Sequence, residues 1–264
     1  MKFFPKKSLG QNFLTDNKIL NMIVELGKIK SNDIVLEVGP GTGNLTEIIL
    51  KKKPKKLVVV EKDKNLSLIL KKKFNNEAEI INDNILNYNH EIYYNKKIII
   101  FGNLPYNIST QIIASLILLK KWPPWYKMLV FMFQKEVADR IIAKNNSKNF
   151  GRLSVLCNWR LEIKKHFDVS KNCFFPKPKI NSTVLSFQPK LYNKFKIKNP
   201  KNLETVTRAL FSNRRKMINK NFIKLFKGKK SIANDLNLNL NKRPEELNSE
   251  MFYKITIKYE ELFC

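Results

Sequence analysis

The segment DIVLEVGPGTGNLTEIIL, residues 33–50, decides the fold class of this 264-residue chain. Its first part, 33–39, is mainly apolar and predicts a buried strand, whereas the apolar spacing of LTEIIL, 45–50, predicts a helix. The glycine-rich loop GPGTG, 39–43, joins these two elements. Because glycine allows tight turns and close approach of the backbone to a ligand, this order of strand, loop and helix predicts a nucleotide-binding loop.

Strands and helices alternate at short spacing around this segment. Further strands are predicted over 57–61, 78–83, 97–103 and 128–134. Helices are predicted over 17–27, with Asp16 as the capping residue, and over 63–73, 109–121 and 135–143. Such alternation is typical of an α/β fold with a doubly wound, Rossmann-like parallel sheet. Two later segments, 161–169 and 182–188, resemble strands that close the sheet as a hairpin.

The composition and the apolar pattern of the chain change after Pro189. A linker rich in lysine, asparagine and proline covers 189–202, and the segment 203–227 then has helical spacing. A final amphipathic helix is predicted over 246–263. We therefore predict an α/β domain over 1–189 and a small all-α domain over 190–264.

Several classes of protein are excluded by composition. The chain lacks a run of 18 apolar residues and a signal-peptide pattern at its start, so we expect no membrane partner. The few cysteines and histidines have no zinc-ligand spacing, so we expect no metal and a reducing, cytoplasmic environment. These residues are Cys157, Cys173, Cys264, His90 and His166.

The net charge of +28 favours a nucleic-acid partner. A competing explanation is that A+T-rich codons inflated lysine, of which there are 43 against seven arginines. Arginine is then the more informative residue, because its planar fork of donors suits phosphate. The segment 205–231 holds nine basic residues and no acid. The expected nucleic-acid contacts are Arg208, Arg214, Arg215, Lys216, Lys220 and Arg243, although a basic run can also be an ordinary solvated face.

The glycine-rich loop does not match the common phosphate-binding patterns. Position 44 is asparagine, so G-x-G-x-x-G is not completed, and the lysine of a P-loop is missing. A loop without phosphate ligands, preceded by Glu37, suits a nucleoside ligand such as S-adenosylmethionine (SAM). Glu37 would then help to order the ammonium group of SAM.

Acidic residues end three consecutive predicted strands. Glu61 lies 22 residues after Gly39, where a carboxylate can accept both ribose hydroxyls, and Asp83 could accept from the adenine amine. Each acid alone could be a surface residue at a strand end. Together with Glu37 and the loop glycines Gly39 and Gly41, they favour a cofactor site.

The corner FGNLPYNIS, 101–109, ends the fourth strand at the same edge of the sheet. The side-chain oxygen of Asn103 and the carbonyl of Leu104 could accept the two N–H groups of a base amine. Pro105 would fix the direction of that carbonyl, and Tyr106 offers a face on which an extruded base can stack. The corner therefore predicts methyl transfer to a base amine, the alternative being an ordinary turn with a capping asparagine.

These motifs resemble the ribosomal RNA adenine N6-dimethyltransferases of the small subunit nearly end to end. Other segments that carry the resemblance are KSLGQNFL (7–14), FMFQKEVADRI (131–141), FFPKPKINSTV (174–184) and FSNRRKMINKNF (211–222). The sequence departs from the family pattern at Asn82, where glycine is usual, which affects the loop before Asp83.

The resemblance implies roles for particular residues and a specific substrate. Asn12 and Leu14 would contact SAM with Gly39, Glu61, Asp83 and Asn103, and Phe174 would be a second ring against the flipped adenine. The family dimethylates two adjacent adenosines in a hairpin loop near the 3′ end of small-subunit rRNA, in a nearly assembled particle, and contributes to ribosome biogenesis. We expect a monomer whose partner is that subunit.

Two alternatives remain open. A large-subunit adenine methyltransferase that confers macrolide resistance shares the NLPY-type corner, although GPGTG, F-x-P-x-P-K and the RRK and RPEEL segments favour the small-subunit enzyme. The other alternative is a binding protein, either a ribosome-assembly checkpoint whose methylation is incidental or a nucleic-acid-binding relative that has lost catalysis. The intact corner from Asn103 to Tyr106 argues against lost catalysis.

Overall fold

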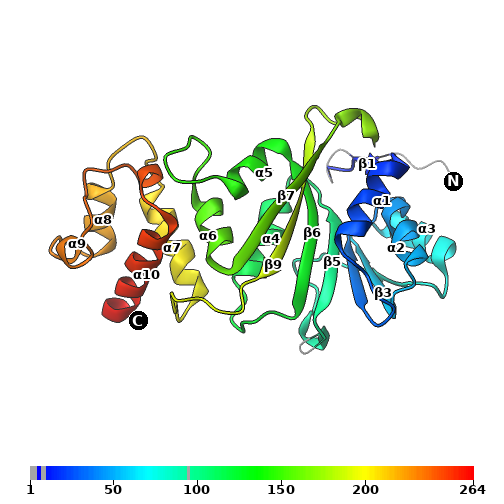
Figure 1. The fold of residues 1–264 in the computed structure, drawn as a ribbon, viewed down its shortest axis with the longest axis horizontal. Coiled ribbons are helices and arrows are strands. Elements are labelled where there is room, and N and C mark those ends of the chain that lie inside the picture. Colours follow the sequence, from blue (N-terminus) through cyan, green and yellow to red (C-terminus); the bar gives the residue numbers. More distant parts are fainter. Residues whose placement is uncertain (1–4, 7–9, 94–95) are drawn as a thin grey trace. The chain divides into compact units, whose positions relative to one another are not determined.

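The computed structural model describes residues 5–6, 10–93 and 96–264 (Figure 1). The first three residues of the KSLGQNFL motif lie outside the described residues. The chain forms two compact units. Unit 1 comprises Met1–Ser115, Pro123–Ala138 and Ile163–Pro189, and unit 2 comprises Leu116–Trp122, Asp139–Glu162 and Lys190–Cys264. The chain thus passes between units at residue 189 and also at earlier points, and the simpler division at 189 stays a prediction.

A seven-stranded sheet in the order β4-β3-β2-β5-β6-β9-β7 forms the centre of the α/β fold. Strands β2 to β6 pair in parallel, and β9 runs antiparallel to β6. The predicted doubly wound sheet, closed by the two late strands, is confirmed. Its strands are β2 Ile34–Val38, β3 Lys56–Glu61, β4 Glu79–Asn82, β5 Ile98–Asn103, β6 Tyr126–Gln134, β7 Leu161–Val169 and β9 Ser182–Pro189.

The helices α1 to α6 begin within one residue of their predicted starts, with one exception. The carboxylate of Asp16 caps its helix by accepting from the backbone N–H of Ile19 at 3.0 Å, as predicted. The exception is α6, which was not predicted. It buries residues around most of its circumference, so its sequence has no clear apolar stripe. The helices up to this point are α1 Asn17–Leu26, α2 Asn44–Lys51, α3 Lys64–Phe74, α4 Ser109–Ile117, α5 Lys135–Ile142 and α6 Arg152–Arg160.

One face of the sheet packs against α1, α2 and α3, which lie close together in Figure 1. Val35, Val59 and Phe101 are fully buried there. Side chains two residues apart on a strand share a face. The residue two positions after each of these three therefore lies on the same face, at the carboxyl end of its strand. These residues are Glu37, Glu61 and Asn103. Core packing therefore brings the predicted polar residues to one edge of one face.

The helices of unit 2 include a break that the sequence did not predict. The segment 203–227 does not form one helix, because 211–218 is a turn between α7 and α8. The turn is held by bonds to distant residues: the backbone N–H of Ile218 donates to Lys242 O at 2.9 Å, and Arg214 binds Glu245. These helices are α7 Pro200–Leu210, α8 Asn219–Leu225, α9 Ile232–Asp235 and α10 Ser249–Phe263.

The described residues contain neither a membrane-spanning helix nor a cluster of metal ligands. Among these residues, no helix is both long and apolar enough to span a bilayer. The same ranges contain no group of three histidine, cysteine, aspartate or glutamate residues that could hold a metal ion.

Candidate active site

A pocket of about 160 Å³ lies in unit 1 at the carboxyl ends of β2, β3 and β5. The chain builds β3 and β4 on one side of β2 and then crosses to build β5 on the other side. Ligands of doubly wound sheets bind at such a switch point. The pocket is lined mainly by the segments 10–14, 37–42, 60–62, 83–85 and 102–108.

The glycine-rich loop adopts a conformation that requires glycine. Gly39 and Gly41 have φ values of +67° and +61°, in the left-handed region that glycine adopts without strain. A Cβ atom on Gly41 would lie only 2.5 Å from Cδ1 of Phe13. Any side chain at position 41 would therefore displace the ring of Phe13 from the pocket wall.

Glu61 is held rigidly at the end of β3. It is 7% exposed, and its two oxygens accept from the backbone N–H groups of Asp63 at 2.8 Å and Gly41 at 3.3 Å. Burial raises the pKa of this carboxyl, and the backbone donors partly offset that effect. The carboxylate is thus fixed against the glycine-rich loop, where the sequence placed the acceptor for a ribose.

Glu37 is more deeply buried, with 1% of its surface exposed. It accepts a hydrogen bond from the hydroxyl of Thr46 at 2.6 Å. Burial raises its pKa to about 8, and the nearby Glu61 charge adds to the effect. Glu37 therefore holds a proton at neutral pH unless a cation enters the pocket.

Asn82 and Asp83 tie the end of β4 to the end of β3. The amide nitrogen of Asn82 donates to Glu61 O at 2.8 Å, and the backbone N–H of Asp83 donates to the same carbonyl at 3.1 Å. Asp83 also lines the pocket. Asn82, which departs from the family pattern, thus supplies an additional link between the two strand ends.

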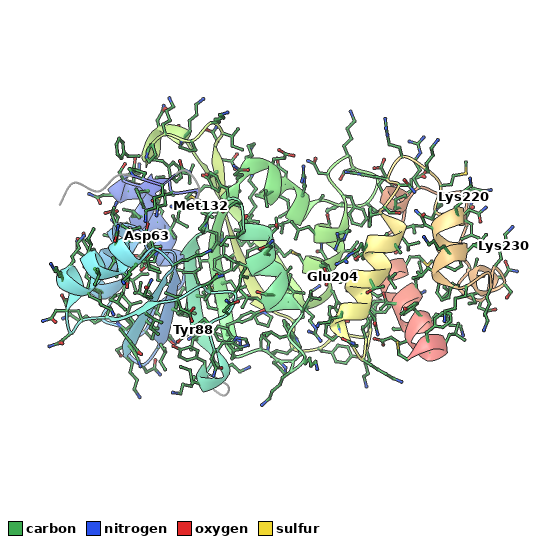
Figure 2. All side chains as sticks on the ribbon, turned by 180° about the vertical axis from the view of Figure 1, so that it is seen from behind. Asp63, Tyr88, Met132, Glu204, Lys220 and Lys230 are labelled. Carbon is green, nitrogen blue, oxygen red and sulfur yellow. The ribbon has the colours of Figure 1, made fainter. Side chains whose placement is uncertain are left out.

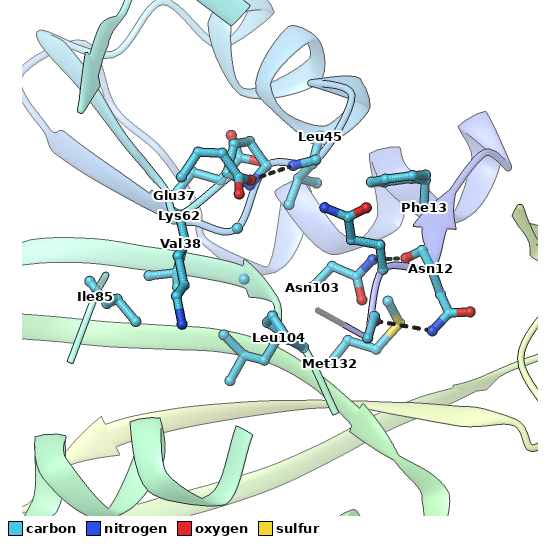
Figure 3. Close-up of a pocket in the computed structure, with 18 of the residues that line it drawn as sticks. Asn12, Phe13, Glu37, Val38, Leu45, Lys62, Ile85, Asn103, Leu104 and Met132 are labelled. Carbon is cyan, nitrogen blue, oxygen red and sulfur yellow. Dashed lines mark hydrogen bonds between the residues drawn. The ribbon is translucent and has the colours of Figure 1, made fainter. Parts of the chain in front are cut away.

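Asn103 is oriented by the N-terminal segment 10–14 (Figure 3). Its amide nitrogen donates to the carbonyl oxygen of Asn12 at 3.0 Å, which leaves its side-chain oxygen as the acceptor. A second amide, that of Asn44, donates to the carbonyl of Leu14 at 2.8 Å. The middle and the last residue of this short segment are therefore fastened over the pocket by side-chain amides.

Asp63 is a further anchor, and it is not among the predicted site residues. One carboxylate oxygen contacts the ammonium of Lys6 at 2.9 Å and the amide of Gln11 at 3.2 Å. The other caps α3 by accepting from Asn65 N at 2.9 Å. Its place at the start of the helix predicted over 63–73 is a capping signal, but nothing in the sequence indicates its contacts with Lys6 and Gln11.

Leu104, Pro105 and Tyr106 continue the pocket wall beyond Asn103. The hydroxyl of Tyr106 lies 2.7 Å from that of Ser182 on β9, and burial raises its pKa. The hydrogen bond holds the hydroxyl end of the ring against β9. The structure thus brings Asn103, Leu104, Pro105 and Tyr106 together with Gly39, Gly41, Glu37, Glu61, Asp83, Asn12 and Leu14 in one pocket.

Comparison with known proteins identifies the class of enzyme that carries this pocket. The model of the family "ribosomal RNA adenine dimethylase" matches residues 3–261. The chain belongs to the ribosomal RNA adenine dimethylase family. Members of this family are SAM-dependent methyltransferases.

Relatives of this rRNA adenine dimethylase match it over nearly its whole length. The ribosomal RNA small subunit methyltransferase A of Pelagibacter ubique is 51% identical over 97% of each chain. A dimethyladenosine transferase from Plasmodium falciparum shares the fold with a TM-score of 0.78 and 28% identity, covering 94% of this chain and 98% of its own. The 23S rRNA methyltransferase ErmE, at 18% identity and a TM-score of 0.68, covers 94% of this chain and 99% of its own and shares the fold.

One predicted site residue of the dimethylase lies elsewhere. Within the described part of the chain, the pocket lining includes Phe13 and Leu14 but not Phe174. Phe174 is 4% exposed and packs in the hydrophobic core with Leu14. Its neighbour Phe175 is 66% exposed. The role of Phe174 as a second ring stays a prediction.

The predicted RNA contacts of the dimethylase lie in unit 2 and differ in their surroundings. Arg214 donates to the carboxylate of Glu245 at 2.9 Å and also bonds Lys148 O, so it holds the turn 211–218 in place. Arg208 pairs with Glu204 at 2.9 Å. The remaining predicted contacts are exposed; they are Arg215, Lys216, Lys220 and Arg243. Lys220 extends outward in Figure 2.

Proposed function

We propose that this rRNA adenine dimethylase transfers methyl groups from SAM to the N6 amines of two adjacent adenosines in the hairpin loop near the 3′ end of small-subunit rRNA. The observation that carries the proposal is the orientation of Asn103, whose amide nitrogen is occupied by Asn12 O. Relatives such as the Pelagibacter ubique protein are small-subunit methyltransferases. We further propose that it acts in the cytoplasm as a monomer on a nearly assembled subunit.

The residues of the pocket fit SAM. The buried carboxylate of Glu61 can accept the ribose hydroxyls, and Asp83 can accept from the adenine amine. Glu37 suits the ammonium group, and Asn12, Leu14 and the glycine-rich loop complete the walls. When bound, SAM supplies an activated methyl group on its sulfonium.

The corner from Asn103 to Tyr106 orients the acceptor. The side-chain oxygen of Asn103 and the carbonyl of Leu104 accept the two N–H groups of the adenine amine, which directs its lone pair toward the methyl. Tyr106 stacks on the extruded base. The amine nitrogen would take the methyl group that SAM supplies, SAM would leave as its thioether, and the amine would release its proton to solvent. Positioning and electrostatics provide the acceleration.

A direct test is incubation of the protein with labelled SAM and unmethylated small subunits, followed by mapping of the modified adenosines. We expect two adjacent dimethylated adenosines. Large subunits serve as the matched control, because the rival function predicts methylation there. Label on the large subunit alone would contradict the proposal, and binding of small subunits without any label would favour an assembly protein without catalysis.

We expect the affinity for SAM to depend on the ionisation of Glu37. Its pKa is raised to about 8, so between pH 6.0 and 7.5 an incoming ammonium must displace a proton from it. The affinity should therefore rise with pH, by up to about tenfold per unit. Calorimetry with wild type and Glu37→Gln checks this, since the variant should lack the rise.

The stability of the SAM-free protein gives an independent readout of the same group. The folded state retains a proton on Glu37 that the unfolded state releases above the ordinary glutamate pKa of 4.5. The free energy of unfolding should therefore fall as pH rises from 4.5 to about 8, and Glu37→Gln should remove this fall. If the free energy of unfolding changed with pH in the same way in wild type and in Glu37→Gln, Glu37 would be ionised throughout this pH range.

We expect the arginine pair of unit 2 to contribute more to subunit binding than an equally basic pair elsewhere. Replacing Arg214 and Arg215 by alanine should weaken binding and lower the slope of log affinity against log salt by about 0.7–0.9 per lost phosphate contact. SAM affinity should not change. Binding titrations at several salt concentrations measure both quantities.

Single variants and a lysine control refine this test. Arg215→Ala should account for most of the change in slope, because Arg214 is engaged by Glu245. Replacing the exposed Lys51 and Lys55 together is the control. If the lysine pair and the arginine pair cause equal losses, total charge alone determines binding.

A further inference from the structure

A two-stranded ribbon sorts two adjacent phenylalanines onto opposite faces. Strand β1, Phe13–Leu14, pairs antiparallel with β8, Phe174–Phe175, in the register Phe13↔Phe175 and Leu14↔Phe174. Successive side chains of a strand point to opposite faces. Leu14 and Phe174 therefore share the face that packs in the core, where each is 4% exposed, and Phe175 shares the face of Phe13.

The face that carries Phe175 is the one beside the glycine-rich loop. Its cross-strand partner Phe13 lines the pocket and contacts the position that a Cβ atom of Gly41 would occupy. Directly opposite residues of an antiparallel pair have Cβ atoms about 5 Å apart. The ring of Phe175, 66% exposed, thus stands at the rim of the pocket.

The backbone on both sides of this ring is fixed. The N–H and the hydroxyl of Thr15 both donate to Cys173 O, at 2.9 and 3.1 Å. At the far end of the segment, Asn181 accepts from the N–H of Lys171 at 3.1 Å with its side chain and from that of Lys135 at 3.0 Å with its carbonyl. A ring on a fixed backbone loses little conformational freedom when a partner stacks on it.

The surroundings of the ring are basic. Residues 170–181 contain three lysines and no acid. Two of these, Lys177 and Lys179, are exposed on either side of the buried Pro178. Exposed aromatic rings among lysines are the pattern by which proteins bind single-stranded nucleic acid, because bases stack on the rings while phosphates meet the cations.

We propose that Phe175 is a stacking platform for a nucleobase that flanks the methylated adenosine, with Lys177 and Lys179 neutralising the adjacent phosphates. The proposal rests on the proposed function, since the occupant is the RNA that the enzyme methylates. It adds a contact at the rim of the pocket, separate from the ring of Tyr106 inside it.

Three substitutions at position 175 separate stacking from simple apolar contact. Phe175→Ala should weaken binding of unmethylated small subunits by about five- to one-hundredfold, the effect of losing one base–aromatic stack. Phe175→Leu should lose nearly as much, because leucine is apolar but has no ring, and Phe175→Tyr should bind as wild type does. SAM affinity, measured by calorimetry, should change by less than about twofold in all three.

The matched control is Leu68→Ala, which removes a 51% exposed apolar side chain from α3. It should leave subunit binding unchanged. The proposal is overturned if Phe175→Leu binds subunits as tightly as wild type, or if the Phe175 variants lose SAM affinity as strongly as subunit affinity. The proposed function is tested separately, because wild-type methylation of small subunits does not depend on this result.

Discussion

Asn103→Ala is expected to lower the rate of methyl transfer at saturating SAM and subunit by at least 100- to 1,000-fold, the usual effect of removing one polar group aimed at a transition state. The side-chain oxygen of Asn103 accepts from the reacting amine in our proposal. Removing it leaves one acceptor, the carbonyl of Leu104. Single-turnover kinetics with labelled SAM and unmethylated small subunits measure the rate.

A control is needed because Asn103 also fastens the segment 10–14. Its amide donates to Asn12 O at 3.0 Å, and Asn44 donates to Leu14 O at 2.8 Å. Asn44→Ala removes one such tether without removing an acceptor for the amine. We expect it to change SAM affinity severalfold at most and to leave the chemical step almost unchanged. If Asn103→Ala methylates at close to the wild-type rate, or no more slowly than Asn44→Ala, the role of this corner is wrong.

Glu61→Ala is expected to weaken SAM binding by at least about tenfold and up to several hundredfold. A hydrogen bond to a charged acceptor contributes about 1.5–3 kcal/mol, and each 1.4 kcal/mol is a factor of ten in affinity. Two ribose hydroxyls would lose such an acceptor. Calorimetric titration of SAM into the RNA-free enzyme measures the loss.

Glu61 also holds the glycine-rich loop, so a second variant separates the two effects. Glu61→Gln keeps an oxygen that can accept from Asp63 N but removes the charge, and we expect an intermediate affinity. Glu25→Ala is the surface control, because Glu25 is an exposed acid that pairs with Lys52. Unchanged affinity in both Glu61 variants would remove this residue from the cofactor site.

Much of the fold and the inner part of the pocket could be predicted because their signals are local. Short apolar runs identified the buried strands, and the chain order of strands placed Glu37, Glu61, Asp83 and Asn103 at one edge of the sheet. In a parallel sheet all carboxyl ends meet at that edge. These residues do line one pocket.

The anchors of the pocket could not be predicted, because their partners are remote in sequence. Asp63 contacts Lys6 and Gln11. Tyr106 contacts Ser182 on β9, the last strand of the sheet in chain order. No spacing rule links such pairs, since only the packed sheet brings them within hydrogen-bonding distance.

The sequence by itself thus determined the α/β class, the glycine-rich loop and the polar corner at Asn103, since apolar runs, turn residues and side-chain type act over a few residues. Tertiary structure alone decided which of two adjacent residues faces outward. Phe174 is buried while Phe175 is exposed, because pairing with β1 sets the register of β8. Arg214 is engaged by Glu245 while Arg215 is exposed, because the turn between α7 and α8 is held by residues far along the chain. A one-residue difference reverses the face of a side chain, and only long-range contacts determine that register.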